Sequence, residues 1–125
     1  MPPKIQPAFD VESFLQSPGL TRSVAAYAAG AMIFTQGDPA DTVLYIQSGR
    51  VKLSVVSESG KAAVVGVLGS GDFLGEGALA GQPIRLATAA AMVASRILTV
   101  PKQQMIRLLH RQHALSDRFI AHMLA

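Results

Sequence analysis

Glu76 and Arg85 carry opposite charges and stand nine positions apart in a segment that is otherwise rich in small and apolar residues. The segment, GDFLGEGALAGQPIRLATAA, spans residues 71–90, and its only other charge is Asp72. A buried charge without a partner is costly, so we expect each of the two to have one. Either they form an ion pair that closes the loop, or they bind a ligand that carries both a hydroxyl group and an anion.

The surrounding residues favour the ligand, although the charge spacing alone does not separate the two alternatives. An arginine presents a planar fork of donors to two phosphate oxygens, and an ionised glutamate accepts a hydrogen bond from a sugar hydroxyl. Gly75, Gly77 and Gly81 allow a ligand to approach the backbone closely. A short helix that begins at Gly75–Glu76 would present free N–H groups to an anion. The segment is neither a Walker loop nor a dinucleotide-binding fingerprint, because no Gly-Lys-Ser/Thr follows and no βαβ unit surrounds it.

Short runs of β-branched and aromatic residues must position this segment. AMIFTQ, TVLYIQ, VKLSVVS and AAVVGVL are separated by the turn sequences GDPAD, SG, ESGK and GSGD. Strand character resumes at Ala87–Val93 and at Arg96–Val100. Strands of this length at close spacing indicate a mainly β fold, an antiparallel jelly roll or β roll (double-stranded β-helix).

Helical segments are expected before, within and after these strands. Leu20–Ala29 is predicted as a second short helix, after a helical turn around Val11–Gln16, and Gly75–Gly81 as a further one. Pro101 is expected at the first position of a helix that contains KQQMIRLLHR, and Ser116 is a good N-cap for a last helix, DRFIAHMLA. The predicted organisation is a helical leader (1–29), a β roll (30–100) and two C-terminal helices (101–125).

Composition narrows the function classes. The chain of 125 residues has no cysteine, which excludes disulfides and thiolate metal sites. Its 11 basic residues are scattered rather than gathered on one helix, which disfavours direct DNA binding by this chain. No signal peptide or run of transmembrane length is present, so the expected location is the cytoplasm, without membrane contact.

The sequence offers no convincing catalytic or metal-binding set. His110 and His113 have the spacing of ligands on one helical turn, but no cysteine or carboxylate cluster completes a zinc site. Nothing matches a nucleophile motif, and a cupin-type enzyme would need histidines on strands that hold none. We therefore expect neither a metal, nor a cofactor, nor an enzyme.

The segment GDFLGEGALAGQPIRLATA resembles the phosphate-binding cassette of cyclic nucleotide-binding domains in the Crp/Fnr superfamily of regulators, which includes catabolite activator protein. The resemblance continues upstream through IFTQGDPADTVLYIQSGRVKLSVVSESGK and covers roughly Gly30 to Leu124. It implies that Glu76 binds the ribose 2′-hydroxyl and that Arg85 neutralises the cyclic phosphate. The other implied ligand contacts are the backbone at Gly75, the backbone N–H groups of Ala78, Leu79 and Leu86, and an apolar wall of Leu53, Val65 and Leu68. Gly37, Gly49 and Gly71 match structural glycines of the family's turns.

Two departures from the family pattern bear on function. Leu86 stands where many of these domains carry Ser, Thr or Ala, and Ser or Thr there tends to accompany cGMP, so the resemblance implies cAMP in preference to cGMP. The sequence ends at Ala125, within what resembles the family's dimerisation helix, and its 125 residues include no counterpart of the family's helix-turn-helix domain. We therefore expect a cyclic nucleotide sensor of a transcriptional regulator without its own DNA-binding domain, with a homodimer through the terminal helix. The alternative is a ligand-independent interaction module, or a regulator fragment, with an empty cassette and a Glu76–Arg85 ion pair.

Overall fold

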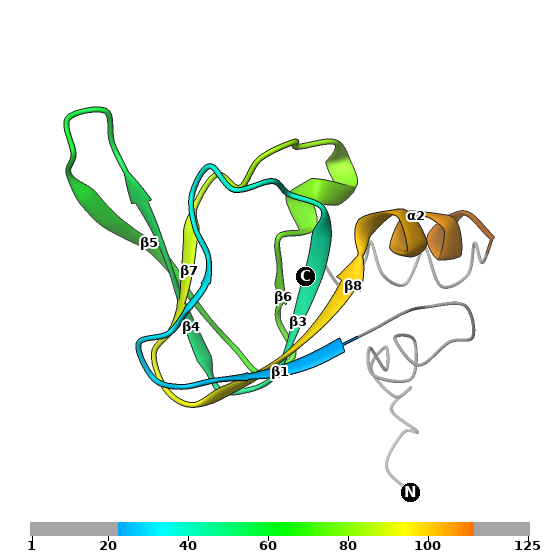
Figure 1. Cartoon of the computed structure of the whole chain (residues 1–125), viewed down its shortest axis with the longest axis horizontal. Coiled ribbons are helices and arrows are strands. Elements are labelled where there is room, and N and C mark those ends of the chain that lie inside the picture. The colour runs from blue at the N-terminus through cyan, green and yellow to red at the C-terminus, as the bar shows by residue number, and fades with distance from the viewer. Residues whose placement is uncertain (1–22, 112–125) are drawn as a thin grey trace, which may run out of the picture.

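Two antiparallel four-stranded sheets form the domain, seen here in a computed structural model that describes residues 23–111 (Figure 1). The strand orders are β1-β8-β3-β6 and β2-β7-β4-β5. The strands of the first sheet are β1 (Ser23–Tyr27), β8 (Ser95–Pro101), β3 (Thr42–Ser48) and β6 (Phe73–Leu74). Those of the second are β2 (Met32–Phe34), β7 (Thr88–Ala91), β4 (Arg50–Val56) and β5 (Ala62–Gly69). The jelly roll predicted from the strand pattern is confirmed.

Apolar side chains from both sheets meet between them and form the core. The buried cluster consists of Leu44, Ile46, Val51, Leu74, Ala89 and Ile97. Phe34, Leu53 and Leu68 pack against this cluster while remaining only partly buried. The core therefore reaches the surface along the second sheet, where an apolar ligand group can contact it.

The helix expected over Leu20–Ala29 is wrong for the part that the structure describes. Ser23–Tyr27 is strand β1, which pairs with β8 along its whole length, from Ser23 opposite Thr99 to Tyr27 opposite Ser95. The segment SVAAY has no clear helical or alternating pattern, so pairing with β8 decides its conformation. The first sheet therefore includes residues that precede Gly30.

Two helices flank the sheets in the described residues. The 3₁₀ helix η1 (Glu76–Ala80) lies between Gly75 and Gly81, and the α-helix α2 (Lys102–Arg111) follows β8. Pro101 does not begin the helix as predicted. It ends β8 opposite Thr42, because pairing with β3 continues to this residue.

Helix α2 rests on the roll through Met105, which is fully buried. The helix contacts β8, β3 and η1, and β3 also contacts η1. The described part of the chain contains no helix with the length and apolar character needed to cross a bilayer. The helical turn predicted around Val11–Gln16 and the helix predicted after Ser116 lie outside the described residues.

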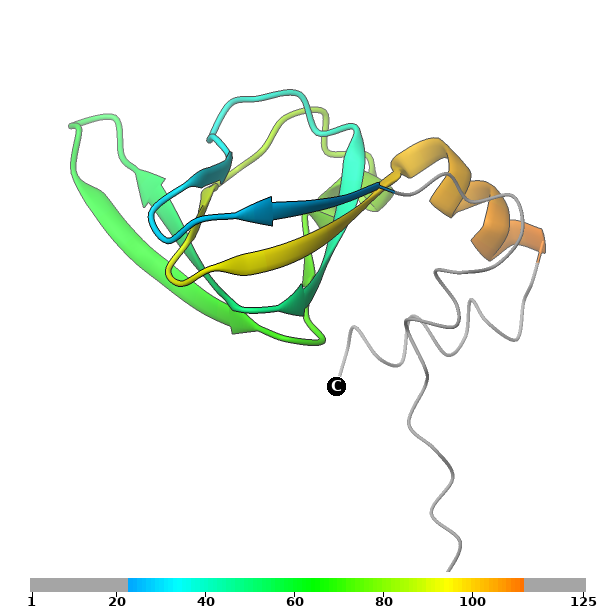
Figure 2. The same cartoon turned by 60° about the horizontal axis from the view of Figure 1, so that its bottom comes forward.

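The hairpin of β4 and β5 extends away from the body of the roll in both views (Figures 1 and 2). Its register shifts at one point, because Leu53 pairs with Gly66 while the next residue, Ser54, pairs with Val64. Val65 is the extra residue of this β-bulge, and its side chain is 60% exposed.

Candidate functional site

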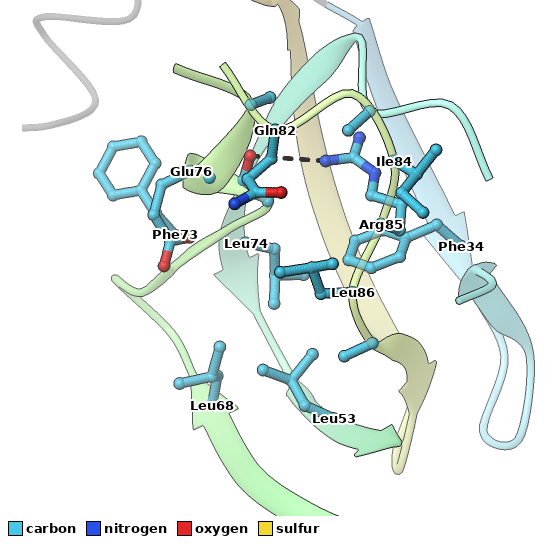
Figure 3. A pocket seen from close by; sticks show the side chains of 15 residues that line it. Phe34, Leu53, Leu68, Phe73, Leu74, Glu76, Gln82, Ile84, Arg85 and Leu86 are labelled. Atoms are coloured by element: carbon cyan, nitrogen blue, oxygen red, sulfur yellow. Dashed lines mark hydrogen bonds between the residues drawn. The ribbon is translucent and has the colours of Figure 1, made fainter. Parts of the chain in front are cut away.

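A pocket of about 220 Å³ opens between η1, the end of β6 and the segment that leads into β7. Figure 3 shows Leu53 and Leu68 at one end of this pocket and Arg85 with Phe34 at the other, with Leu86 between them. Glu76 lies on the side formed by η1, and Gln82 stands between Glu76 and Arg85 in this view. The pocket thus combines an apolar end with one acidic and one basic residue.

Most of the residues singled out from the sequence line this pocket. They are Gly75, Glu76, Ala78, Arg85, Leu86, Leu53 and Leu68. Leu79 and Val65 do not line it. Val65 occupies the bulge of β5, and the sequence signal that could have indicated a bulge is Gly66, an isolated glycine within the strand pattern. The lining residues that sequence reasoning missed include Phe34, Phe73, Gln82 and Ile84.

Arg85 is the only buried charged side chain of the described residues, at 5% exposure. Its Nη2 donates to the carbonyl oxygen of Thr42 and to Thr42 Oγ1, both at 2.9 Å. Its Nη1 donates to the carbonyl oxygen of Gly75 at a longer 3.4 Å. The guanidinium also lies over the ring of Phe34, with Cζ 4.5 Å from the ring centroid. Arg85 is therefore held by backbone, hydroxyl and aromatic groups together.

The carbonyl of Thr42 is available to Arg85 because strand β6 is short. Asp41 accepts a backbone hydrogen bond from Lys102, so the next carbonyl along β3, that of Thr42, points to the other side, toward β6. β6 ends at Leu74, which pairs with Leu44. The chain then turns away into η1, and Arg85 takes the place of a further strand residue opposite Thr42.

The main chain of Arg85 is fixed as firmly as its side chain. Its N–H donates to the carbonyl of Asp38, and its own carbonyl accepts from the N–H of Gly37, each at 2.8 Å. Burial lowers the pKa of the Arg85 guanidinium, while the negative charges of Asp41 and Asp38 oppose that shift. An arginine nevertheless remains protonated at neutral pH, so the pocket carries a permanent positive charge.

Glu76 and Arg85 do not form the ion pair that the empty-cassette alternative predicts. Within residues 23–111 the carboxylate of Glu76 makes no hydrogen bond or ion pair, whereas Arg85 binds Thr42 and Gly75. The backbone N–H of Ala78, one of the expected phosphate donors, donates to the carbonyl of Gly75 at 3.1 Å. The exposed Glu76 side chain is therefore the acidic group that can accept from a ligand hydroxyl without breaking an existing contact.

Comparison with known proteins agrees with this geometry. A family model described as "Cyclic nucleotide-binding domain" matches residues 24–112, most of the chain. The chain belongs to the cyclic nucleotide-binding domain family. Its fold is that of the Crp/Fnr superfamily, as the resemblance of the cassette predicted.

Relatives of this cyclic nucleotide-binding domain come from bacteria and from an animal. Catabolite activator protein of Thermus thermophilus is 26% identical, with a TM-score of 0.74, over 89% of this chain and 50% of that protein. The sensor domain of the transcriptional regulator DNR from Pseudomonas aeruginosa is 25% identical, with a TM-score of 0.73, over 81% of this chain and 68% of that domain's chain. The cGMP-dependent protein kinase egl-4 of Caenorhabditis briggsae is 34% identical over 85 residues, which are 66% of this chain and 11% of the kinase. The chain thus spans about half of the activator and about a tenth of the kinase.

Proposed function

We propose that this domain binds a cyclic mononucleotide, cAMP in preference to cGMP, and serves as the sensor domain of a transcriptional regulator. The observation that carries the proposal is the pocket itself, in which a buried Arg85 and a Glu76 without a polar partner among residues 23–111 flank an apolar surface. A cyclic nucleotide presents a ribose hydroxyl, a phosphate and a flat base, which match these three parts of the pocket in chemical character.

Each ligand group has a partner of suitable chemistry. The Glu76 carboxylate would accept from the ribose 2′-hydroxyl, and the Arg85 guanidinium would bind the phosphate. The base would rest on Leu53, Leu68 and Leu86, which are partly or largely exposed along the pocket. Leu86 carries no hydroxyl that could pair with the amino group of guanine, which supports adenine as the preferred base.

Helix η1 would connect ligand binding in the pocket to the position of α2. Ligand bound at Glu76 would favour one placement of η1, and α2 contacts η1 and is anchored by the buried Met105. The ligand would shift the equilibrium between two placements of α2 only as far as its affinity differs between them. A cytoplasmic location, a homodimer through the C-terminal helix and the absence of enzymatic activity and of direct DNA binding by this chain stay predictions.

Calorimetric titration with cAMP and cGMP tests the proposal. Glu76→Gln is the most informative variant because the exposed Glu76 side chain supports no polar contact within residues 23–111, so the fold should be unaffected. Glu58→Gln, in the exposed turn between β4 and β5, removes the same charge away from the pocket and serves as the matched control. We expect saturable cAMP binding that weakens about tenfold or more in Glu76→Gln and is unchanged in Glu58→Gln. No heat at millimolar cAMP or cGMP, from folded protein, would refute the proposal and support a ligand-independent interaction module.

A further inference from the structure

The hydrogen-bond donors of Arg85 are distributed unevenly. A guanidinium has five N–H donors, two on each Nη and one on Nε. Nη2 donates to the carbonyl oxygen and to the hydroxyl oxygen of Thr42, each at 2.9 Å. Nη1 makes a single longer bond to Gly75, and the buried Nε has no hydrogen-bond partner among residues 23–111.

This distribution limits how a phosphate can bind. A guanidinium has two edges that present a pair of parallel donors, one formed by Nε and Nη2 and the other by Nη1 and Nη2. Nη2 belongs to both edges. Because both acceptors of Nη2 belong to Thr42, a phosphate that binds two oxygens at either edge of Arg85 would compete with Thr42 for Nη2.

Thr42 can influence the ligand site only through its hydrogen bonds to Arg85. It is the first residue of β3, it is partly buried, and it does not line the pocket. Its carbonyl belongs to the backbone and remains after any substitution. Its hydroxyl is the one acceptor on Nη2 that a substitution can remove without changing the course of the chain.

We infer that the Thr42 hydroxyl competes with the ligand phosphate for Arg85 and thereby sets the affinity of the pocket. Thr42 is thus a positioning residue that holds the guanidinium in a withdrawn arrangement. This inference rests on the proposed function, because it concerns the affinity of the same site. If the hydroxyl instead oriented Arg85 toward the phosphate, its removal would weaken binding, so the sign of the change separates the two roles.

The experiment compares Thr42→Val, Thr42→Ser and the wild type in calorimetric titrations with cAMP. Valine has nearly the shape of threonine and suits a β-strand, so Thr42→Val should fold. Freeing one bond to a charged group should tighten cAMP binding about tenfold in Thr42→Val, while Thr42→Ser, which keeps the hydroxyl, should bind like the wild type. Thr99→Val, on the neighbouring strand β8, is the matched control and should also bind like the wild type. Equal or weaker binding by Thr42→Val would overturn the inference.

A second readout needs no ligand. Nitrogen-15 NMR of the Arg85 guanidinium in the free protein should show slow rotation and slow hydrogen exchange at Nη2 in the wild type and faster motion in Thr42→Val. If the wild type and all variants fail to bind cAMP and cGMP, the proposed function is wrong. The inference about Thr42 is then tested by NMR alone, and unchanged hydrogen exchange at Arg85 Nη2 in Thr42→Val would overturn it. If only Thr42→Val binds, the competition is supported directly.

Discussion

Alanine substitutions at the two glycines that flank η1 should differ in their effect on stability. Gly75 and Gly81 both adopt left-handed backbone conformations, with φ of 71° and 91°. An alanine in this conformation costs about 1–2 kcal/mol at either position. A Cβ at Gly81 would have no neighbour within 4 Å, whereas a Cβ at Gly75 would overlap Arg85 Nη1 and lie 3.1 Å from its Cζ. Gly81→Ala therefore measures the backbone strain alone.

The extra effect at Gly75 depends on whether the guanidinium can move. Arg85 is 5% exposed and bonded to Thr42, so a displaced guanidinium would lose its two bonds to that residue. Hydrogen bonds that involve a charged group contribute about 1.5–3 kcal/mol each, and partial rehydration of the displaced charge offsets some of this loss. We expect Gly75→Ala to lower the free energy of unfolding by about 2 kcal/mol more than Gly81→Ala does.

Urea denaturation followed by circular dichroism measures this difference, with the slope of the transition compared as well as its midpoint. A second pair of variants places Gly75→Ala and Gly81→Ala in an Arg85→Ala background, where the extra loss at Gly75 should disappear. Equal destabilisation by the two glycine substitutions in the wild-type background would refute this prediction, because it would mean that the Arg85 guanidinium can move without lowering the free energy of unfolding.

Three further substitutions test the packing of the roll, of α2 and of Arg85. Gly49→Ala should destabilise the domain by about 3 kcal/mol in urea denaturation, because φ is 111° and a Cβ would lie 2.7 Å from the backbone of Ser95; near-wild-type stability would contradict this. Met105→Ala should lower stability by about 2–5 kcal/mol in calorimetric melting, because its side chain is fully buried; a small loss would show that α2 is not anchored there. Phe34→Leu keeps an apolar side chain but removes the ring beneath Arg85, and it should lower the free energy of unfolding by about 1 kcal/mol in urea denaturation. An unchanged midpoint would show that the cation–π contact does not stabilise the fold.

The strands between Met32 and Gly69 lie close to where the sequence pattern predicts them. Each of the four apolar runs from AMIFTQ to AAVVGVL encloses most or all of one strand, because turn residues mark both ends of each run. β1 could not be predicted in this way. Its alanines and single valine suit either a helix or a strand, and the deciding interaction is the distant strand β8.

The candidate site was only partly predictable for the same reason. The cassette sequence placed Glu76, Arg85 and their glycines together, because these residues are close in the chain. The main partner of Arg85 is Thr42, which is 43 residues away, and it depends on where strand β6 ends. The position of Val65 depends on a register shift between β4 and β5. Gly66 indicates that a bulge can occur in β5, but the pairing with β4 decides which residue is the extra one.

The bond between Arg85 and the Thr42 carbonyl has a consequence for the evolution of this fold. Arg85 completes a strand edge that would otherwise lack a donor, so a descendant that no longer used its ligand would still lose stability if the arginine were replaced. Selection for folding alone can preserve such an arginine in proteins whose pockets have fallen out of use. To separate homologues that bind a ligand in the pocket from homologues that do not, the residue at the position of Glu76 is more informative than the residue at the position of Arg85. The reason is that Glu76 makes no polar contact that supports the fold within residues 23–111.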